Sequence, residues 1–319
     1  MEERAFFGTH KVSALSLGGG GIGQVWGETT RQEAVHTLIE AVDCGIDWID
    51  VAPSYGDGEA ERAVAEAFSG TLPAGGRVST KCKLLTGEEV SFADRLDISL
   101  EASLERLQLP SVELLMLHNM IIDTPGNWSE PGCDFFDYLE QVVPALIKKE
   151  QEGAIRAWGI TGIGFPSAVS LALASLPKPN AIQIITNALD SAGDIQGFEG
   201  PFAPRETIYE ATENGVGVMG IRAVQAGALT DEFDRVVDEQ SADMQDYIRA
   251  HKFRVLSRRL GVTPASLAHR YALSIHGVAT VVLGVKNRRE LYDCLEAENR
   301  GKLDEDVLVL VDEAIREWR

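Results

Sequence analysis

Four ionisable side chains recur at one end of short apolar runs, and together they have the chemistry needed for proton transfer. Asp50, Lys81 and His118 each close such a run, and Tyr55 follows Asp50 in a short loop rich in glycine and proline. Each residue alone has a structural explanation, as a turn cap, a solvated lysine, a core histidine or a packing ring. Their repetition at the same end of successive runs favours a shared chemical role.

The group of four suits protonation of an oxygen that becomes an alkoxide. A phenol ionises near pH ~10, and a nearby lysine cation favours the phenolate and lowers that pKa. Asp50 can pair with Lys81 and keep the ammonium charged, while His118 can hydrogen-bond the substrate oxygen. No side chain supplies a hydride, so the chemistry predicts a nicotinamide cofactor.

Eight short runs, mostly apolar or β-branched, alternate with amphipathic stretches along the chain. Runs of this kind are typical of strands covered on both faces, as in a parallel sheet. Eight strand-then-helix cycles favour a closed (β/α)8 barrel, whose active site lies at the carboxyl ends of the strands. The predicted strands are residues 14–18, 46–50, 77–81, 112–118, 155–161, 181–185, 216–221 and 279–283.

No linker or shift in composition divides the chain, so we expect one domain over residues 1–319. A two-domain arrangement is the alternative, because the gap from 221 to 279 is wide. This gap has to hold a helix, a long loop and a second helix. The helices that the apolar spacing predicts most clearly are residues 31–43, 91–107 and 265–275.

Composition excludes several classes of function. The chain has 29 Lys and Arg against 49 Asp and Glu, a formal net charge of −20, which disfavours nucleic acid and anionic lipid as partners. No stretch approaches the ~20 apolar residues of a membrane span, and the N-terminus lacks a signal-peptide pattern. We expect a cytoplasmic protein with reduced thiols, since its four cysteines form no CxxC pair.

Several segments of the chain are similar to the sequence motifs of a known family. The segment 45–61 resembles the aldo-keto reductase signature, in which Asp50 and Tyr55 occupy an Asp-x-Ala-x-x-Tyr-Gly-x-x-Glu motif. The stretches that end at Lys81 and His118 are similar to the family's strands with its catalytic lysine and histidine. Later blocks follow in the family's order, so the resemblance runs from about residue 12 to the last helix. It implies Tyr55 as proton donor, Lys81 and Asp50 as the pair that tunes it, and His118 as the residue that orients the substrate.

The resemblance also implies that a nicotinamide dinucleotide binds across the strand ends without a GxGxxG fold. The glycine-rich run 18–27 is then a floor for close approach, or simply a turn between strand and helix. The family's nicotinamide-binding Ser-Asn pair is replaced by Thr161 and Gly162, and its usual aromatic by Ile221. The expected cofactor residues are Gly19, Gly20, Thr161, Gln183, Ile221, Arg222, Gly284, Lys286, Asn287 and Glu290.

A cationic patch over residues 286–289 stands where the family binds the adenosine phosphate, after the eighth strand. From its charge we expect NADP(H) to be preferred, with NAD(H) also possible. The family's distal Asn appears here as Cys294, and its Pro-Lys-Ser as residues 283–285. The residue that would contact the 2′-phosphate therefore stays open.

The expected activity is NAD(P)H-dependent reduction of a small aldehyde or ketone by a monomer or simple homo-oligomer. The alternatives are an NAD(P)⁺-dependent dehydrogenase of sugars or other alcohols, and a redox-sensing module that binds cofactor with little turnover. A metal-dependent hydrolase is disfavoured, because the histidines lack ligand spacing. Specificity is expected from loops 22–28, 119–135 and 190–205, with Trp26, Trp128 and Phe198 as pocket walls.

Overall fold

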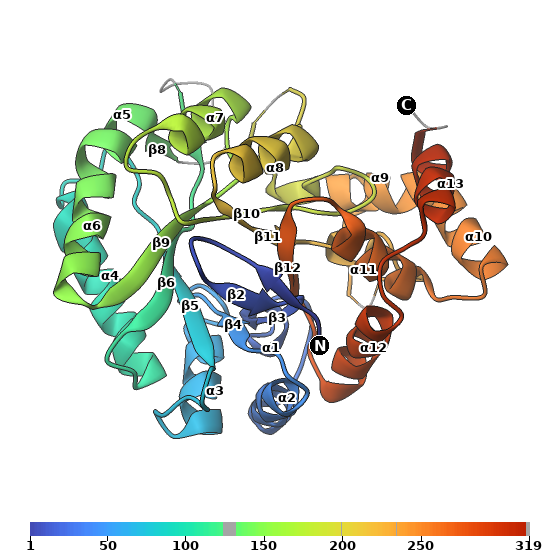
Figure 1. Cartoon of the computed structure of the whole chain (residues 1–319), viewed down its shortest axis with the longest axis horizontal. Helices are drawn as coiled ribbons and strands as arrows, with labels where there is room; N and C mark the ends of the chain where they lie inside the picture. The colour runs from blue at the N-terminus through green and yellow to red at the C-terminus, as the bar shows by residue number, and fades with distance from the viewer. Residues whose placement is uncertain (124–131, 199, 234, 317–319) are drawn as a thin grey trace.

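The eight apolar runs form eight parallel strands that close into a barrel in the computed structural model, which describes residues 1–123, 132–198, 200–233 and 235–316 (Figure 1). Neighbours around the barrel follow chain order, and the last strand pairs with the first. The predicted barrel is confirmed, with strand limits within two residues of those expected. The strands are β3 (Leu15–Gly18), β4 (Trp48–Asp50), β5 (Arg77–Cys82), β6 (Val112–Leu117), β9 (Ile155–Thr161), β10 (Ala181–Ile185), β11 (Gly217–Ile221) and β12 (Val278–Leu283).

Amphipathic helices cover the outside of the barrel (Figure 1). Their buried apolar residues form one core cluster with those of the strands. Side-chain caps fix where several begin: Thr30 accepts from the backbone N–H of Glu33, and Thr263 accepts from that of Ser266. These helices are α2 (Arg31–Asp43), α3 (Glu59–Phe68), α4 (Phe92–Leu107), α6 (Val143–Glu152), α7 (Pro166–Ala174), α8 (Pro204–Glu213), α11 (Pro264–Ser274) and α12 (Arg288–Asn299).

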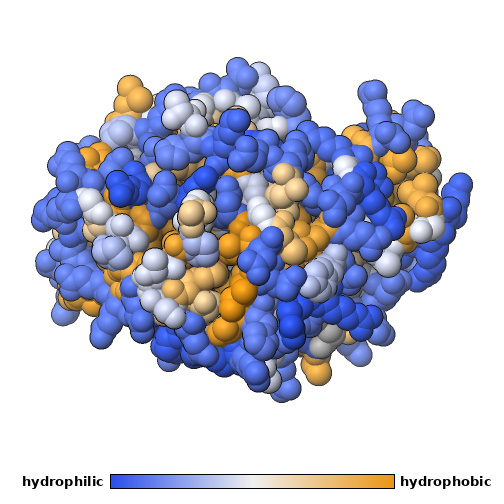
Figure 2. Space-filling model, turned by 60° about the horizontal axis from the view of Figure 1, so that its bottom comes forward, coloured by the Kyte–Doolittle hydropathy of each residue, from blue (hydrophilic) through white to orange (hydrophobic). Residues whose placement is uncertain are grey.

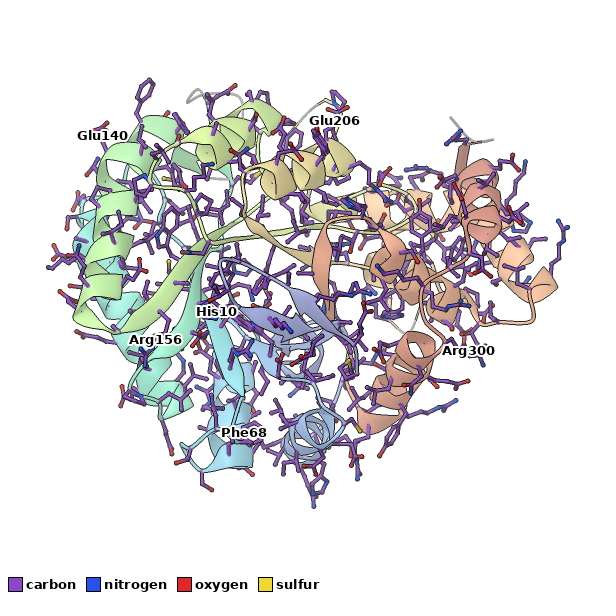
Figure 3. All side chains as sticks on the ribbon, in the orientation of Figure 1. His10, Phe68, Glu140, Arg156, Glu206 and Arg300 are labelled. Atoms are coloured by element: carbon purple, nitrogen blue, oxygen red, sulfur yellow. The ribbon has the colours of Figure 1, made fainter. Side chains whose placement is uncertain are left out.

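A β-hairpin closes the amino-terminal end of the barrel. Its strands β1 (Glu3–Ala5) and β2 (Lys11–Ser13) pair antiparallel, and the Phe6 ring meets the Trp48 ring edge-on at 5.4 Å. His10 lies in the hairpin turn, over the middle of the barrel in Figure 3. With this end closed, the loops at the carboxyl ends of the strands are left to form a site.

The segment between β11 and β12 differs from the expected two helices. It holds a 3-10 turn (Gln225–Gly227) and three α-helices, α9 (Ala242–Arg249), α10 (His251–Arg259) and α11. The extra helix arises because residues 242–259 are divided at Ala250 into two short amphipathic helices. The carboxyl-terminal helix α13 (Glu305–Arg316) packs against α10 through a second apolar cluster that includes Phe253 and Val311.

Short elements lie in the loops at the carboxyl ends of the strands. The loop expected over 119–135 contains β7 (Ile121–Ile122) and β8 (Cys133–Asp134), which pair in parallel. It leads into α5 (Phe135–Asp137) and a π-helical turn (Tyr138–Val142). The short helix α1 (Gly19–Ile22) follows β3, and a 3-10 turn (Gly193–Ile195) lies in the loop after β10.

Hydrophilic side chains cover most of the face seen in Figure 2, with apolar patches between them. This surface agrees with the formal net charge of −20. A search of the described residues finds no helix with the length and apolar character needed to cross a membrane.

Candidate active site

A buried ion pair joins the ends of β4 and β5. The Lys81 ammonium donates to Asp50 Oδ2 at 2.7 Å and to the backbone carbonyl of Val51 at 2.9 Å. Ser79 donates to the other Asp50 oxygen at 2.7 Å and accepts from the Trp48 indole at 2.9 Å. Both oxygens of Asp50 are therefore held, and the carboxylate fixes the direction of the lysine.

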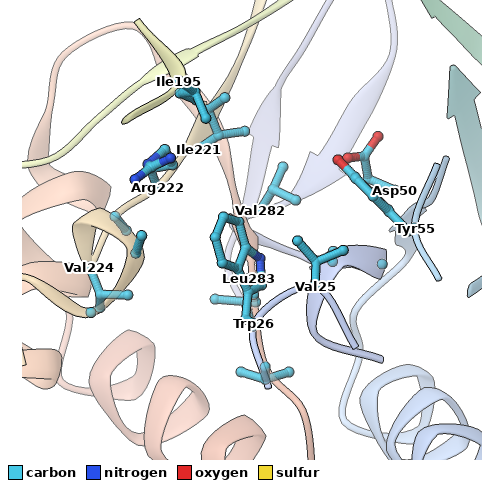
Figure 4. A pocket seen from close by; sticks show the side chains of 18 of the residues that line it. Val25, Trp26, Asp50, Tyr55, Ile195, Ile221, Arg222, Val224, Val282 and Leu283 are labelled. Atoms are coloured by element: carbon cyan, nitrogen blue, oxygen red, sulfur yellow. The ribbon is translucent and has the colours of Figure 1, made fainter. Parts of the chain in front are cut away.

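Tyr55 lies beside this pair, with Lys81 Nζ 4.7 Å from the centre of its ring. The two groups also act on each other electrostatically, since each is among the causes of the other's pKa shift. In Figure 4 the oxygens of Asp50 and Tyr55 lie close together at one side of the pocket. The structure thus brings the three predicted residues into one cluster.

The glycine-rich run explains how Tyr55 reaches this position. A Cβ on Gly19 would lie 3.1 Å from Tyr55 Cδ2, and a Cβ on Gly23 would lie 2.9 Å from Tyr55 Cβ. A Cβ on Gly20 would lie 2.6 Å from the indole nitrogen of Trp26. Residues without side chains therefore let both rings approach the backbone of α1.

The electrostatics of the phenol differ from the expectation that the lysine alone would lower its pKa. Burial raises the pKa of Tyr55, the Lys81 charge opposes this shift, and Asp50 adds to it, so that the net pKa is raised. Burial lowers the pKa of Lys81, but the charges and hydrogen bonds of Asp50 and Tyr55 more than offset this, and its pKa is raised. The ammonium stays charged, and the phenol keeps its proton at neutral pH.

His118 follows β6 on the same rim. Its backbone N–H donates to the carbonyl of Cys82 at 2.7 Å, and its ring meets the Tyr55 ring edge-on at 5.8 Å. Burial, followed by the charges of Lys81 and Lys83, holds the pKa of His118 well below its usual range. The imidazole is therefore neutral, so one ring nitrogen donates and the other accepts.

These residues lie at one end of a cavity of about 760 Å³ over the carboxyl ends of the strands. This volume is within the range of small-molecule and cofactor sites. The cavity lining includes Tyr55 and His118 at one end and residues from the first turns of α12 at the other. Figure 4 shows Trp26, Arg222 and Tyr55 around this cavity. Of the residues expected at the site, it is lined by Gly19, Gly20, Trp26, Asp50, Tyr55, His118, Thr161, Gln183, Ile221, Arg222, Gly284, Lys286 and Glu290.

Buried polar groups in the middle of the cavity leave hydrogen-bonding capacity for a ligand. Gln183 is 3% exposed, and its amide nitrogen makes a weak contact to the sulfur of Met219 at 4.0 Å. Thr161 stands beside it on β9, in register with Gln183, and is 7% exposed. A primary carboxamide is complementary to such an amide and hydroxyl pair, so these residues fit a nicotinamide.

Trp26 lies near two guanidinium groups, those of Arg222 and Arg235, each 5.7 Å from the centre of its ring. Both arginines pair with Asp243 of α9, at 2.7 and 3.2 Å. Arg222 has a positive φ of 55°, a conformation that is costly for a residue with a side chain, and Asn187 supports it by donating to its carbonyl at 3.3 Å. Arg235 and Asp243 were not expected from the sequence.

The residues of the predicted cationic patch, 286–289, do not face the cavity together. Lys286 lines the cavity, but its ammonium pairs with Glu290 at 2.7 Å. Arg288 pairs instead with Glu33 of α2 at 3.0 Å, and the Asn287 side chain caps α12 by accepting from the backbone N–H of Glu290. The cavity lining includes neither of these two residues nor Arg289.

The three residues expected as pocket walls have different outcomes. Trp26 lines the cavity. Phe198 does not, because it is buried among Met120, Phe165 and Phe202 beneath the loop surface, so its place in the pocket is not supported. Trp128 lies outside the described residues. Lys83 lines the cavity near His118 and was not expected there.

Metal chemistry has no visible basis in the described part of the chain. A search of those residues finds no cluster of three or more His, Cys, Asp or Glu side chains placed to hold an ion. The four cysteines are free, and three of them are buried. Burial raises the pKa of the Cys82 thiol to about 12.

Comparison with known proteins identifies the family and agrees with the fold. The aldo/keto reductase family model matches residues 14–316. The chain is 27% identical to L-galactose dehydrogenase of Arabidopsis thaliana, over 96% of this chain and 91% of that protein. A holo-form aldo-keto reductase of Bacillus halodurans superposes with a TM-score of 0.74 at 21% identity, over 98% of this chain and 96% of that one. One from Klebsiella pneumoniae in complex with NADPH gives a TM-score of 0.69 at 19% identity, over 98% and 95%. The structural likenesses show the fold, and the family match shows that the chain belongs to the aldo/keto reductases and is an oxidoreductase.

Proposed function

We propose that the protein interconverts a small carbonyl compound and its alcohol with a nicotinamide dinucleotide. The observation that carries the proposal is the contact between the Tyr55 side chain and a lysine whose charge is held by a buried carboxylate. The reduced nicotinamide supplies the hydride when it is bound. The chain itself supplies the proton and the orientation of the substrate.

Tyr55 acts as the proton donor in carbonyl reduction. Its phenol is protonated at neutral pH, because burial raises its pKa. Lys81 stabilises the phenolate that forms when the proton leaves, and Asp50 holds Lys81 in place. The proton returns to Tyr55 when the reaction runs toward the carbonyl, so the same group serves both directions.

His118 orients the substrate oxygen. It is neutral, stands edge-on to Tyr55 and lines the same end of the cavity. An N–H of a neutral imidazole donates to a carbonyl oxygen without adding a full charge to the apolar pocket. The substrate oxygen then lies between the imidazole and the phenol, with the carbonyl carbon turned toward the middle of the cavity.

The dinucleotide occupies the rest of the cavity. Thr161 and Gln183 receive its carboxamide, and Gly19, Gly20 and Gly284 allow close approach of the backbone. Arg222 supplies positive charge at the middle, suited to the pyrophosphate. The redox-sensing alternative is less well supported, since the proton-donor cluster is intact.

Sugar or alcohol oxidation is the second candidate, and the relative L-galactose dehydrogenase favours it. Both directions use one transition state, so the geometry of Tyr55 and His118 serves either. An aldose or its oxidised product is therefore a test substrate in either direction.

A mutant pair tests the proposal. The purified protein is assayed with NADH and NADPH against a panel of aldehydes and ketones, and with NAD⁺ and NADP⁺ against sugars, by the change in reduced-nicotinamide absorbance. Tyr55→Phe should lower kcat roughly 10²–10⁴-fold for every active substrate. Its cofactor binding, measured by quenching of tryptophan fluorescence, should stay within about twofold, because the ring remains. Near-normal turnover by this variant would refute the assignment of the proton donor.

A further inference from the structure

The far end of the cavity, where α12 begins, carries more negative than positive charge. Among the described residues that line this end of the cavity, Lys286 is the cation. Glu290 binds it twice: the carboxylate pairs with the ammonium at 2.7 Å and accepts from the Lys286 backbone N–H at 2.9 Å. Asp293, one turn further along the same face of α12, also lines the cavity. One lysine is thus balanced by Glu290, and Asp293 adds a further negative charge.

The neighbouring arginines do not offset the negative charge at this end of the cavity, because each is paired elsewhere. Arg288 donates through two side-chain nitrogens and its backbone N–H to Glu33, at 3.0–3.1 Å. These bonds hold its guanidinium against α2. Arg222 and Arg235 share Asp243 near Trp26, at the middle of the cavity.

Two further side chains at this end of the cavity, His269 and Cys294, are neutral. His269 Nδ1 lies 2.9 Å from the carbonyl of Ala265, which makes Nδ1 the protonated nitrogen, and Nε2 accepts from the Cys294 thiol at 3.5 Å. Burial lowers the pKa of His269 and raises that of Cys294, so the pair carries no charge. Both residues line the cavity.

We propose that this end of the site selects NAD(H) over NADP(H), with Glu290 as the residue that sets the preference. The inference rests on the proposed function, and it reverses the preference expected from the cationic patch. A carboxylate accepts a hydrogen bond from the 2′-hydroxyl of a ribose, as acidic residues do in other dinucleotide sites. A 2′-phosphate brings about two negative charges and meets Asp293 and a lysine that is already paired.

Equilibrium binding tests the proposal without turnover. Quenching of tryptophan fluorescence by NADH and NADPH is measured for the wild-type protein and for Glu290→Gln, together with the fragments 5′-AMP and 2′,5′-ADP. The matched control is Glu296→Gln, on the same helix, whose carboxylate pairs with Arg300 and does not line the cavity.

We expect the wild-type protein to bind NADH at least about tenfold more tightly than NADPH, and 5′-AMP more tightly than 2′,5′-ADP. Glu290→Gln removes the carboxylate that pairs with Lys286 and should tighten NADPH binding roughly tenfold, while Glu296→Gln leaves the ratio unchanged. Raising the salt concentration should narrow the ratio in the wild-type protein, because it screens the repulsion.

Tighter binding of NADPH than NADH by the wild-type protein would overturn the proposal and leave the proposed function standing. A ratio that moves equally in Glu290→Gln and in the control would overturn the role of Glu290. Failure of both dinucleotides and both fragments to bind would instead overturn the proposed function, and the selectivity with it.

Discussion

The Lys81 ammonium lies 4.7 Å from the centre of the Tyr55 ring while it donates to the Asp50 carboxylate at 2.7 Å. The Lys81 side chain is fully shielded from solvent and that of Asp50 is 3% exposed, so water screens their charges weakly. Burial favours the neutral phenol, and the ammonium favours the phenolate. The pKa of Tyr55 is the outcome of these opposing effects, which makes it sensitive to either partner.

Removing the lysine charge should therefore shift the pH profile in a known direction. Lys81 lowers the pKa of Tyr55, so Lys81→Met raises that pKa further. Reduction needs the protonated phenol and is lost as the pH rises through its pKa, so the alkaline limb of kcat/KM should move to higher pH. The plateau should fall roughly 10²–10⁴-fold, because the phenolate loses its stabilisation.

The control for this experiment is Lys83→Met. Lys83 lines the same cavity but does not contribute to the pKa of Tyr55, so its variant should keep the alkaline limb of the wild-type protein. Circular dichroism checks that each variant is folded. An alkaline limb that stays in place, or moves to lower pH, in Lys81→Met would contradict the electrostatic role of the lysine.

The depressed pKa of His118 gives a prediction for the acidic limb of kcat/KM against pH. Its pKa is held well below 6.5, so it gains a proton only as the pH falls below that depressed value. Reduction should therefore show no loss from this group between about pH 6 and 8. The measurement is kcat/KM against pH together with NMR titration of the imidazole, and His118→Phe identifies its signals. An imidazole that titrates near its ordinary value, with a parallel loss of activity, would count against a neutral His118.

The sequence predicts the barrel and the cluster at its rim because local patterns determine both. Eight apolar runs are enough to define a parallel barrel, and a residue that closes such a run must lie at the carboxyl rim. Asp50, Lys81 and His118 could therefore be placed together before any coordinates were known. Tyr55 needed the family motif as well, because its position depends on a loop.

The sequence does not predict which charged side chains pair with one another across the cavity. Asp243 lies 21 residues after Arg222 and meets it only because α9 folds back over the site. The run of cations at 286–289 looks like one patch in sequence, yet successive side chains on a helix start point in different directions. Arg288 faces α2, and Lys286 faces the cavity. Phe198 lies in a mouth loop as expected, but it packs into an aromatic cluster.

Arg222 gives a prediction that is separate from cofactor preference. Its guanidinium lines the middle of the cavity, where NADH and NADPH are identical. Arg222→Leu should weaken both dinucleotides by about tenfold, or ~1.4 kcal/mol, without changing their ratio. Arg249→Leu is the control, since Arg249 pairs with Asp246 and does not line the cavity. Fluorescence quenching measures both variants, and unchanged binding in Arg222→Leu would remove this residue from the cofactor site.

A buried carboxylate next to strand β5 gives a prediction for stability. Glu61 of α3 is fully buried, and it accepts from Arg106 of α4 at 2.6 Å and from Thr80 of β5 at 2.6 Å. Arg106→Met leaves this carboxylate without a cation and should lower the free energy of unfolding by about 3 kcal/mol. Unfolding in urea, followed by circular dichroism, measures the loss.

The comparison for Arg106 is Arg62, an arginine on α3 itself. Arg62 pairs with Glu59 at 3.5 Å and its side chain is 42% exposed, so Arg62→Met should cost less than about 1 kcal/mol. Because Thr80 adjoins Lys81 on β5, the Arg106 variant should also lose activity at a lower urea concentration than the wild-type protein. Equal losses of stability in the two variants would show that water reaches the Glu61 carboxylate, and would contradict the cost expected for breaking its buried ion pair with Arg106.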